Sequence, residues 1–296
     1  MASIAHRLRI SLTTERVLEV AVAGPEDGTP LVFHHGTPGS QILFEPFIEA
    51  AVARGLRYLS YSRPGYGNST RQSGRTVADC ATDTASILDQ LGAKRFYVIG
   101  WSGGGPHALG CAALLPQRVI AASTIAGVAP FGPQDLDWLA GMGKENIEEF
   151  QAALAGPDEL RSFLERVGPG FAQVTGGQII SAFGDLVDDV DKAVLSGQLG
   201  VFLAENGREA LRNGFWGWFD DDIAFISNWG FDLGRIKVPV TLWQGAKDRM
   251  VPFAHGCWLA EHVPEVRAHL LPEHGHLSLA VGSFSRILDE LIASGN

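Results

Sequence analysis

The sequence predicts an α/β protein: a mainly parallel sheet flanked by helices and interrupted by a helical insertion. Short β-branched and aromatic runs alternate with helical stretches, the pattern of a parallel sheet that is covered on both faces. From residue 131 to residue 232 this alternation stops and only helix-like stretches remain, after which strand and helix alternate again. Apolar residues form 46% of the chain, which is enough for a substantial core.

The predicted strands are short apolar runs bounded by glycine, proline or polar turns. They lie at residues 7–12, 16–24, 29–36, 57–62, 95–100, 119–127, 238–245 and 266–272. Only a polar turn separates the first two, so they are expected to form an antiparallel hairpin. The later strands are separated by helical stretches and are expected to run parallel.

The predicted helices of the core repeat apolar residues at helical spacing. They lie at residues 44–55, 76–92, 106–116, 255–263 and 285–293. Gly92 is placed as a C-terminal stop for the second of them. The chain is therefore divided into a first core part (1–130), a helical insertion (131–232) and a second core part (233–296).

Charge excludes some classes of partner. The net charge is −10 and there is no block rich in lysine and arginine, which argues against nucleic acid or an anionic membrane as a partner. The acidity is concentrated in the insertion, which has 18 acidic and 6 basic residues. Its Asp220–Asp221–Asp222 run is expected at the solvated start of a helix, because aspartate favours first turns.

The cysteines and the N-terminal sequence bear on location. Cys80, Cys111 and Cys257 form an odd, widely spaced set with no CxxC pair, which indicates reduced thiols. The N-terminal residues contain no long apolar signal segment, and no apolar run is long enough to span a bilayer. We therefore expect a cytoplasmic protein.

A single serine stands among glycines in GWSGGGP, residues 100–106, between a predicted strand and a predicted helix. The stretch fits G-x-S-x-G, in which a sharp strand-to-helix turn exposes a nucleophilic serine, here Ser102. Gly100 and Gly104 are small, as the close passage of strand and helix requires. Gly103 offers a backbone N–H for developing negative charge. A glycine-rich turn with the serine as helix cap is the alternative, and the strand–turn–helix setting favours the nucleophile.

A serine nucleophile needs a histidine base and an acid that orients the histidine, in the chain order Ser, Asp or Glu, His for this turn. Asp248 follows one predicted strand and His276 follows the next, so both are expected at the sheet edge that carries Ser102. His274 competes with His276. Asp232 and the Asp220–Asp221–Asp222 run compete with Asp248, but they come before the predicted strand. A metal site at the two histidines has no evident third ligand.

The turn HHGTPG, residues 34–39, is predicted to complete an oxyanion site. The backbone N–H of Thr37 would point at the same oxygen as that of Gly103, and the loss of one such donor typically costs ~3 kcal/mol of transition-state stabilisation. An ordinary β-to-α turn is the alternative. His34 and His35 are expected to structure this loop rather than act as bases. His35 and Trp101 are the predicted substrate contacts.

The ordered set HGTPGS, SRPGYGNS, GWSGGGP, GAKDRMVP and GHLSL resembles the α/β-hydrolase family with a serine nucleophile. The resemblance implies an eight-stranded, mostly parallel sheet, with residues 131–232 as a helical cap over the pocket. It implies Ser102 as nucleophile, His276 as base and Asp248 as orienting acid, with no metal or organic cofactor. Ser62 departs from the family, whose members often carry aspartate before R-P-G-x-G.

These observations predict a serine hydrolase that cleaves a small carboxylic ester or related acyl compound. A proline-releasing aminopeptidase is the enzymatic alternative, because GWSGGGP and HGTPG also resemble the proline iminopeptidases, whose cap carboxylates hold the substrate's amino terminus. A non-hydrolytic lyase or ligand-binding member of the fold is the alternative from another class. Most aromatic residues of the 215–231 stretch are expected to pack the cap onto the core. The sequence leaves the natural substrate and the oligomeric state open.

Overall fold

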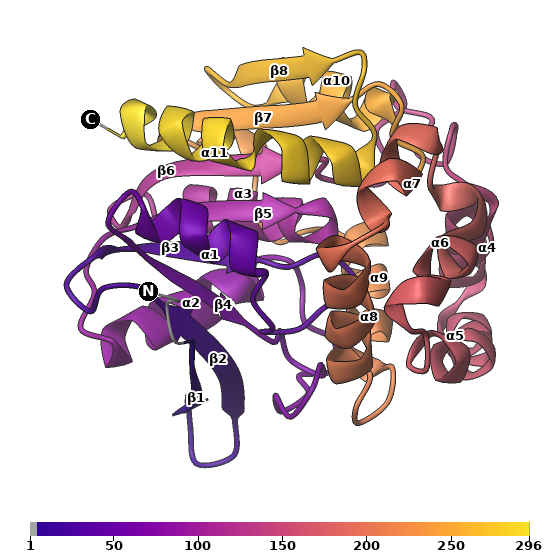
Figure 1. Ribbon diagram of the computed structural model, residues 1–296, viewed down its shortest axis with the longest axis horizontal. Helices are drawn as coiled ribbons and strands as arrows, with labels where there is room; N and C mark the ends of the chain where they lie inside the picture. Colours follow the sequence, from indigo (N-terminus) through magenta and orange to yellow (C-terminus); the bar gives the residue numbers. More distant parts are fainter. Residues whose placement is uncertain (1–4, 296) are drawn as a thin grey trace.

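The computed structural model, which describes residues 5–295, contains one eight-stranded sheet with the strand order β1-β2-β4-β3-β5-β6-β7-β8 (Figure 1). Only β2 runs antiparallel to its neighbours β1 and β4, and all other pairs are parallel. The predicted hairpin and mostly parallel sheet are confirmed. The strands are β1 (His6–Ser11), β2 (Val17–Ala23), β3 (Thr29–His34), β4 (Leu56–Tyr61), β5 (Phe96–Trp101), β6 (Val119–Ile125), β7 (Val240–Gly245) and β8 (Arg267–Leu271).

Five helices cover the two faces of the sheet (Figure 1). On one face lie α1 (Glu45–Val52) and α11 (His276–Ser294); on the other lie α2 (Asp79–Gln90), α3 (Gly105–Leu114) and α10 (Phe253–His262). The last helix is longer than expected, because α11 begins at His276 rather than at residue 285. Its first residue is thus the predicted base.

The central strands are apolar throughout because they are buried on both faces, as β5 illustrates with every residue buried. On the face covered by α1 and α11, the ring of Phe47 stacks on that of Phe284 with centroids 3.7 Å apart. On the other face, α2 and α3 bury Ile87, Leu88 and Leu109 completely. Each such side chain stabilises the fold by about 1.5–3 kcal/mol relative to exposure.

Between β6 and β7 the chain forms helices α4 to α9, which we call the helical segment. They lie beyond the carboxyl ends of the parallel strands, to the right in Figure 1. The helices of the segment are α4 (Lys144–Ala155), α5 (Pro157–Phe171), α6 (Ile179–Phe183), α7 (Asp189–Leu195), α8 (Gln198–Ala210) and α9 (Trp216–Ile226).

No helix of residues 5–295 is both long and apolar enough to cross a membrane.

Candidate active site

Ser102 lies in the sharp turn between β5 and α3. Its φ of 57° falls in the left-handed region, which is uncommon for a residue with a side chain. A Cβ at Gly100 would overlap the carbonyl of Gly104, and a Cβ at Gly104 would overlap the carbonyl of His34. The need for small residues on both sides of Ser102 is therefore confirmed, and the turn presents its hydroxyl at the carboxyl edge of the sheet.

Asp248 and His276 meet at the same edge. His276 Nδ1 lies 2.8 Å from Asp248 Oδ2, and both side chains are buried. The other carboxylate oxygen accepts hydrogen bonds from the backbone N–H groups of Met250 (2.9 Å) and Val251 (2.8 Å). Gln244 Nε2 donates to Oδ2 at 3.1 Å. The carboxylate is thus held by four donors and fixes the imidazole.

The electrostatics of this pair favour a histidine base. Burial lowers the pKa of His276, but the charge and hydrogen bond of Asp248 outweigh burial, so the pKa lies above its ordinary value of 6.5. Burial also raises the pKa of Asp248, although the hydrogen bonds and charge of His276 oppose this. This contact indicates that Nδ1 of the neutral ring carries the proton and donates a hydrogen bond to Asp248. Nε2 is then the basic nitrogen.

Ser102 and His276 line the same cavity, whose volume is about 540 Å³. No hydrogen bond joins the two side chains in the described chain. In serine hydrolases without substrate this contact is often long and tightens when substrate binds. Trp101 packs beside the histidine, with ring centroids 6.0 Å apart and planes inclined by 25°. The three predicted triad members therefore lie at one edge of the sheet, with two of them in direct contact.

The predicted oxyanion residues also come together. A Cβ at Gly36 would lie 3.3 Å from Ser102 Cβ, so the loop after β3 runs directly past the serine. Gly103 faces Thr37 so closely that a Cβ there would overlap the threonine hydroxyl. Thr37 and Gly103 thus approach each other closely from two different segments of the chain beside Ser102, and an oxyanion site would need their two N–H groups to point at one oxygen.

The two predicted substrate contacts, His35 and Trp101, differ in the hydrogen bonding of their ring nitrogens. Both His35 and Trp101 line the cavity. Both ring nitrogens of His35 are occupied, since Nδ1 lies 2.7 Å from Gly36 O and Nε2 accepts from Arg63 N at 3.4 Å. Burial, followed by the charge of Arg63, lowers its pKa well below the ordinary value. His35 therefore offers the cavity a neutral ring and no free polar atom, whereas the indole Nε1 of Trp101 is buried without a hydrogen-bond partner in the described part of the chain.

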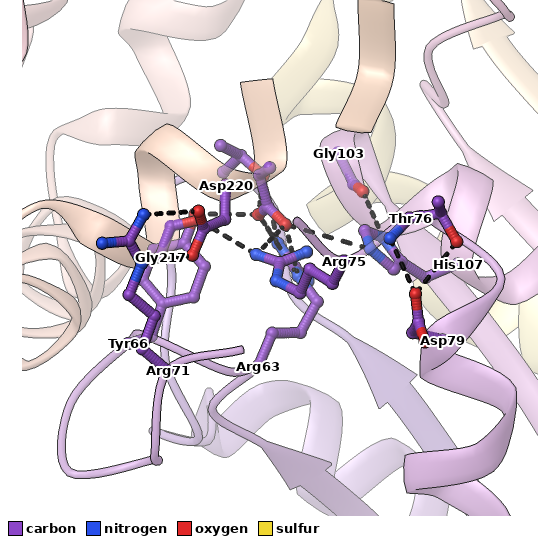
Figure 2. Close-up of polar contacts among 12 residues, drawn as sticks. Arg63, Tyr66, Arg71, Arg75, Thr76, Asp79, Gly103, His107, Gly217 and Asp220 are labelled. Carbon is purple, nitrogen blue, oxygen red and sulfur yellow. Dashed lines mark hydrogen bonds and ion pairs between the residues drawn. The ribbon is translucent and has the colours of Figure 1, made fainter. Parts of the chain in front are cut away.

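The expectation of a solvated Asp220–Asp221–Asp222 run is wrong. All three residues lie inside α9 and are buried. The reason is a group of arginines in the loop after β4: Figure 2 shows Arg63, Arg71 and Arg75 turned toward the helix that carries Asp220. Arg71 pairs with Asp220 at 2.9 Å. Asp220 and Asp221 thus belong to an internal ion-pair site.

Asp221 is the centre of that site. Its carboxylate binds Arg63 (2.6 Å), Arg75 (2.7 Å) and the hydroxyl of Tyr66 (2.8 Å). Burial raises its pKa, but the two arginines outweigh burial and hold the pKa well below its ordinary range. Arg63 also donates to His35 O at 2.6 Å. This ion-pair network therefore joins α9 to the loop that carries Thr37, a function that the sequence motifs did not signal.

The cavity wall is mostly apolar and is shared by the core and the helical segment. The apolar side chains from the two parts include Phe33, Phe47, Phe163, Phe171, Phe183 and Trp218. Among the aromatic residues of the 215–231 stretch, only Trp218 lines the cavity, which agrees with the expected packing role of most of them.

Glu149 is the most deeply buried carboxylic acid on the cavity wall. Trp218 Nε1 donates to its Oε1 at 2.6 Å. Neither oxygen of the adjacent, fully buried Asp222 accepts from a donor group. Burial raises the pKa of Glu149 to about 7, and burial followed by the charge of Glu149 raises that of Asp222 well above its ordinary value. Both directions favour the protonated form of these carboxyl groups over the charged form.

The chain is similar to known proteins both in sequence and in fold. A non-heme chloroperoxidase of Streptomyces lividans is 30% identical over 236 residues, 78% of either chain. A pimeloyl-[acyl-carrier protein] methyl ester esterase of Nitrosomonas europaea is 27% identical over 258 residues, 84% of this chain and 89% of its own. An esterase from Exiguobacterium antarcticum superposes with a TM-score of 0.68 at 21% identity, covering 98% of this chain and 99% of its own.

The family comparison covers most of the chain. A family model described as alpha/beta hydrolase fold matches residues 29–283, from the third strand into the last helix. This range includes every predicted site residue. The hydrolases among the relatives support a hydrolase activity. The chain belongs to the alpha/beta hydrolase fold family.

Proposed function

We propose that the protein is a serine hydrolase that cleaves small carboxylic esters or related acyl compounds through an acyl-enzyme. The observation that carries this proposal is the buried 2.8 Å contact between His276 and Asp248 on the wall of the cavity that Ser102 enters. Ser102 would be the nucleophile, His276 the general base and Asp248 the acid that orients it.

In the first half of the reaction, Ser102 Oγ attacks the carbonyl carbon while His276 Nε2 takes the hydroxyl proton. The N–H groups of Gly103 and Thr37 stabilise the oxyanion. Asp248 stabilises the imidazolium. The carbon–oxygen bond to the alcohol then breaks, and His276 gives the proton to the leaving oxygen, so that the acyl group stays on the serine.

In the second half, water attacks the acyl-enzyme and His276 takes one of its protons. The bond to Ser102 breaks, the serine oxygen recovers the proton, and the carboxylic acid leaves. Every proton transfer passes through the same imidazole nitrogen. No metal or organic cofactor is needed for these steps.

The cavity supports an apolar substrate of small to moderate size. A volume of about 540 Å³ lies within the usual range for small-molecule sites. Its wall is supplied by both the core and the helical segment, and we propose that residues 131–232 act as a cap that excludes water from the ester. Trp101 and His35 would contact the acyl or alcohol group.

Two chromogenic substrates test the proposal. Short p-nitrophenyl esters should be hydrolysed, and Ser102→Ala should abolish this turnover. Turnover of proline p-nitroanilide alone would replace the ester proposal with an aminopeptidase.

The aminopeptidase is a second candidate because carboxyl groups line the cavity. Glu145, Glu148 and Glu149 are all on the wall, at the side formed by α4. A carboxylate there could bind an amino terminus. If this candidate is correct, the wild type should turn over proline p-nitroanilide, and Glu149→Gln should reduce this turnover selectively. If the ester proposal is correct, the wild type should hydrolyse the esters and leave the anilide intact.

A non-hydrolytic lyase or binding protein remains the candidate from another class. A ligand-binding member of the fold has no need for an activated serine. A fluorophosphonate probe, which reacts with activated serines, should label the wild type and spare Ser102→Ala. Equal labelling of both proteins, or of neither, would favour this class.

Location and partners follow from composition. We propose a cytoplasmic protein, supported by three free cysteines in the described chain, two of them buried. The net charge of −10 supports a small-molecule substrate rather than a nucleic acid or an anionic membrane. Cell fractionation with an antibody would test the location.

A further inference from the structure

An aspartate of the helical segment binds the first turn of the helix that begins with the predicted base. Asp191, in α7, accepts hydrogen bonds from the backbone N–H groups of His276 (2.8 Å), Leu277 (3.1 Å) and Ser278 (2.8 Å). The first N–H groups of a helix have no partner within the helix, so a carboxylate placed there satisfies them and interacts favourably with the helix dipole. Figure 1 shows α7 beside this end of α11.

The contact between Asp191 and the start of α11 is buried, and the carboxylate lies close to the backbone there. Asp191 has no exposed surface. Gly275 precedes the helix, and a Cβ at this position would lie 2.6 Å from the Asp191 carboxylate. Asp188 Oδ1 in turn accepts from the backbone N–H of Asp191 at 3.1 Å, which fixes the start of α7. The glycine therefore leaves the space that the carboxylate occupies.

We infer that Asp191 is a positioning residue that holds His276 in its reactive orientation from the helical segment. The three hydrogen bonds fix the backbone of the first turn of α11, from which the imidazole projects. Asp248 fixes the ring at Nδ1, and Asp191 fixes the backbone that carries the ring. The inference rests on the proposed serine-hydrolase function, in which His276 is the base.

Asp191 also contributes to the charge around the histidine. The charged groups that face His276 are Asp248, from the loop after β7, and Asp191, from α7. Both raise the pKa of His276 against burial, with Asp248 contributing more. Removal of the Asp191 charge should therefore lower the pKa of the histidine, an effect that a purely structural residue would not produce.

The first test compares Asp191→Asn with Asp189→Asn. Asp189 lies in the same helix, its side chain is fully exposed, and it pairs with the partly exposed Lys192. For p-nitrophenyl ester hydrolysis, Asp191→Asn should lower kcat about tenfold with little change in KM. The acidic limb of its kcat/KM profile should move to lower pH by roughly half a unit. Asp189→Asn should match the wild type.

A second pair of variants tests whether a loss of activity acts through the Asp191 contact rather than through misfolding of the Asp191→Asn variant. Gly275→Ala keeps the Asp191 charge but places a methyl group against it, so it should also lower kcat. In an Asp191→Ala background the same methyl group should fit into the vacated space and cost little, within about a factor of two. Equal losses from Gly275→Ala in both backgrounds would overturn the inference, because the methyl group would then act through another contact.

A measurement without turnover separates this inference from the proposed function. Amide hydrogen exchange at Leu277 and Ser278 should be about tenfold faster in Asp191→Asn than in the wild type. The NMR titration of His276 should move to lower pH in the same variant. Unchanged exchange and titration would overturn the inference even if the protein hydrolysed no ester. Absence of ester turnover with both changes present would overturn only the proposed function.

Discussion

The hydroxyl of Thr37 donates a 2.7 Å hydrogen bond to the carboxylate of Asp221, a residue 184 positions further along the chain. This contact ties the predicted oxyanion loop to α9. Asp221 is fully buried, and Arg63 bridges it to the same loop through hydrogen bonds to Gly36 O (3.0 Å) and Thr37 Oγ1 (3.0 Å). The position of the Thr37 N–H therefore depends on a carboxylate outside the sheet core.

Asp221→Asn should be strongly destabilising. The substitution keeps the size of the side chain but leaves Arg63 and Arg75 as buried charges without a counter-charge. Breaking a buried pair in this way typically costs about 3–5 kcal/mol. The free energy of unfolding, measured by urea denaturation, should fall by this amount relative to the wild type.

Asp220→Asn is the matched control for this loss. Asp220 pairs with Arg71, whose side chain is 30% exposed and can return to water. The free energy of unfolding should therefore fall clearly less in Asp220→Asn than in Asp221→Asn. Equal losses from the two neighbouring aspartates would contradict the central role assigned to Asp221.

The pH dependence of turnover should follow His276. The base must be neutral, and its pKa is raised above 6.5 mainly by Asp248 against burial. The kcat/KM value should therefore be constant at high pH and fall as the pH decreases through that raised pKa. Asp248→Asn removes the charge that raises the pKa of His276. The acidic limb of the residual kcat/KM profile should therefore lie at lower pH than in the wild type. Glu273→Gln, at a side chain that is 79% exposed, should leave the limb unchanged.

Ser102 should carry backbone strain that glycine relieves. At a φ of 57°, glycine avoids a Cβ clash that alanine keeps. The Ser102→Gly variant should be more stable to urea than Ser102→Ala by about 1 kcal/mol. Ser86 in α2 provides the control, because glycine in a regular helix should be less stable than alanine by about 1 kcal/mol. The same sign at both positions would argue against strain in the turn.

Glu149→Gln should stabilise the protein at alkaline pH. The folded-state pKa of Glu149, about 7, lies above its ordinary value of 4.5, so the folded state binds more protons than the unfolded state between these values. Stability of the wild type is therefore lost as the pH rises through this window. The glutamine amide can donate to Asp222 at every pH, while its oxygen still accepts from Trp218.

Unfolding by urea at pH 5 and pH 8 measures this effect. The advantage of Glu149→Gln should be larger at pH 8. Glu148→Gln, at a half-exposed neighbour that pairs with Lys144, should show little dependence on pH. An advantage of equal size at both pH values would contradict the raised pKa of Glu149.

The sequence was sufficient for the fold class and for the positions in the fold of residues that belong to a local pattern. Ser102 was identifiable because its turn needs small residues at Gly100 and Gly104, and this requirement is visible within five positions. Asp248 and His276 were identifiable because parallel strands end at the same edge. These inferences need only chain order and local sterics.

The contacts made by the helical segment were not predictable in this way. Asp191 and Asp221 act on residues 85 and 184 positions away in the chain, respectively, and no spacing rule connects them. Three consecutive aspartates indicated a solvated surface, yet α9 buries all three and pairs Asp220 and Asp221 with arginines. The three arginines between residues 63 and 75 were the available signal, since buried charges require partners.

Covalent labelling of Ser102 tests the central claim most directly. After reaction with a fluorophosphonate, peptide mass spectrometry should find the adduct on Ser102 in the wild type. Labelling should be at least about a thousandfold slower in His276→Ala, because the hydroxyl then lacks its base. An adduct on another residue, or labelling of Ser102 at the same rate without His276, would contradict the account.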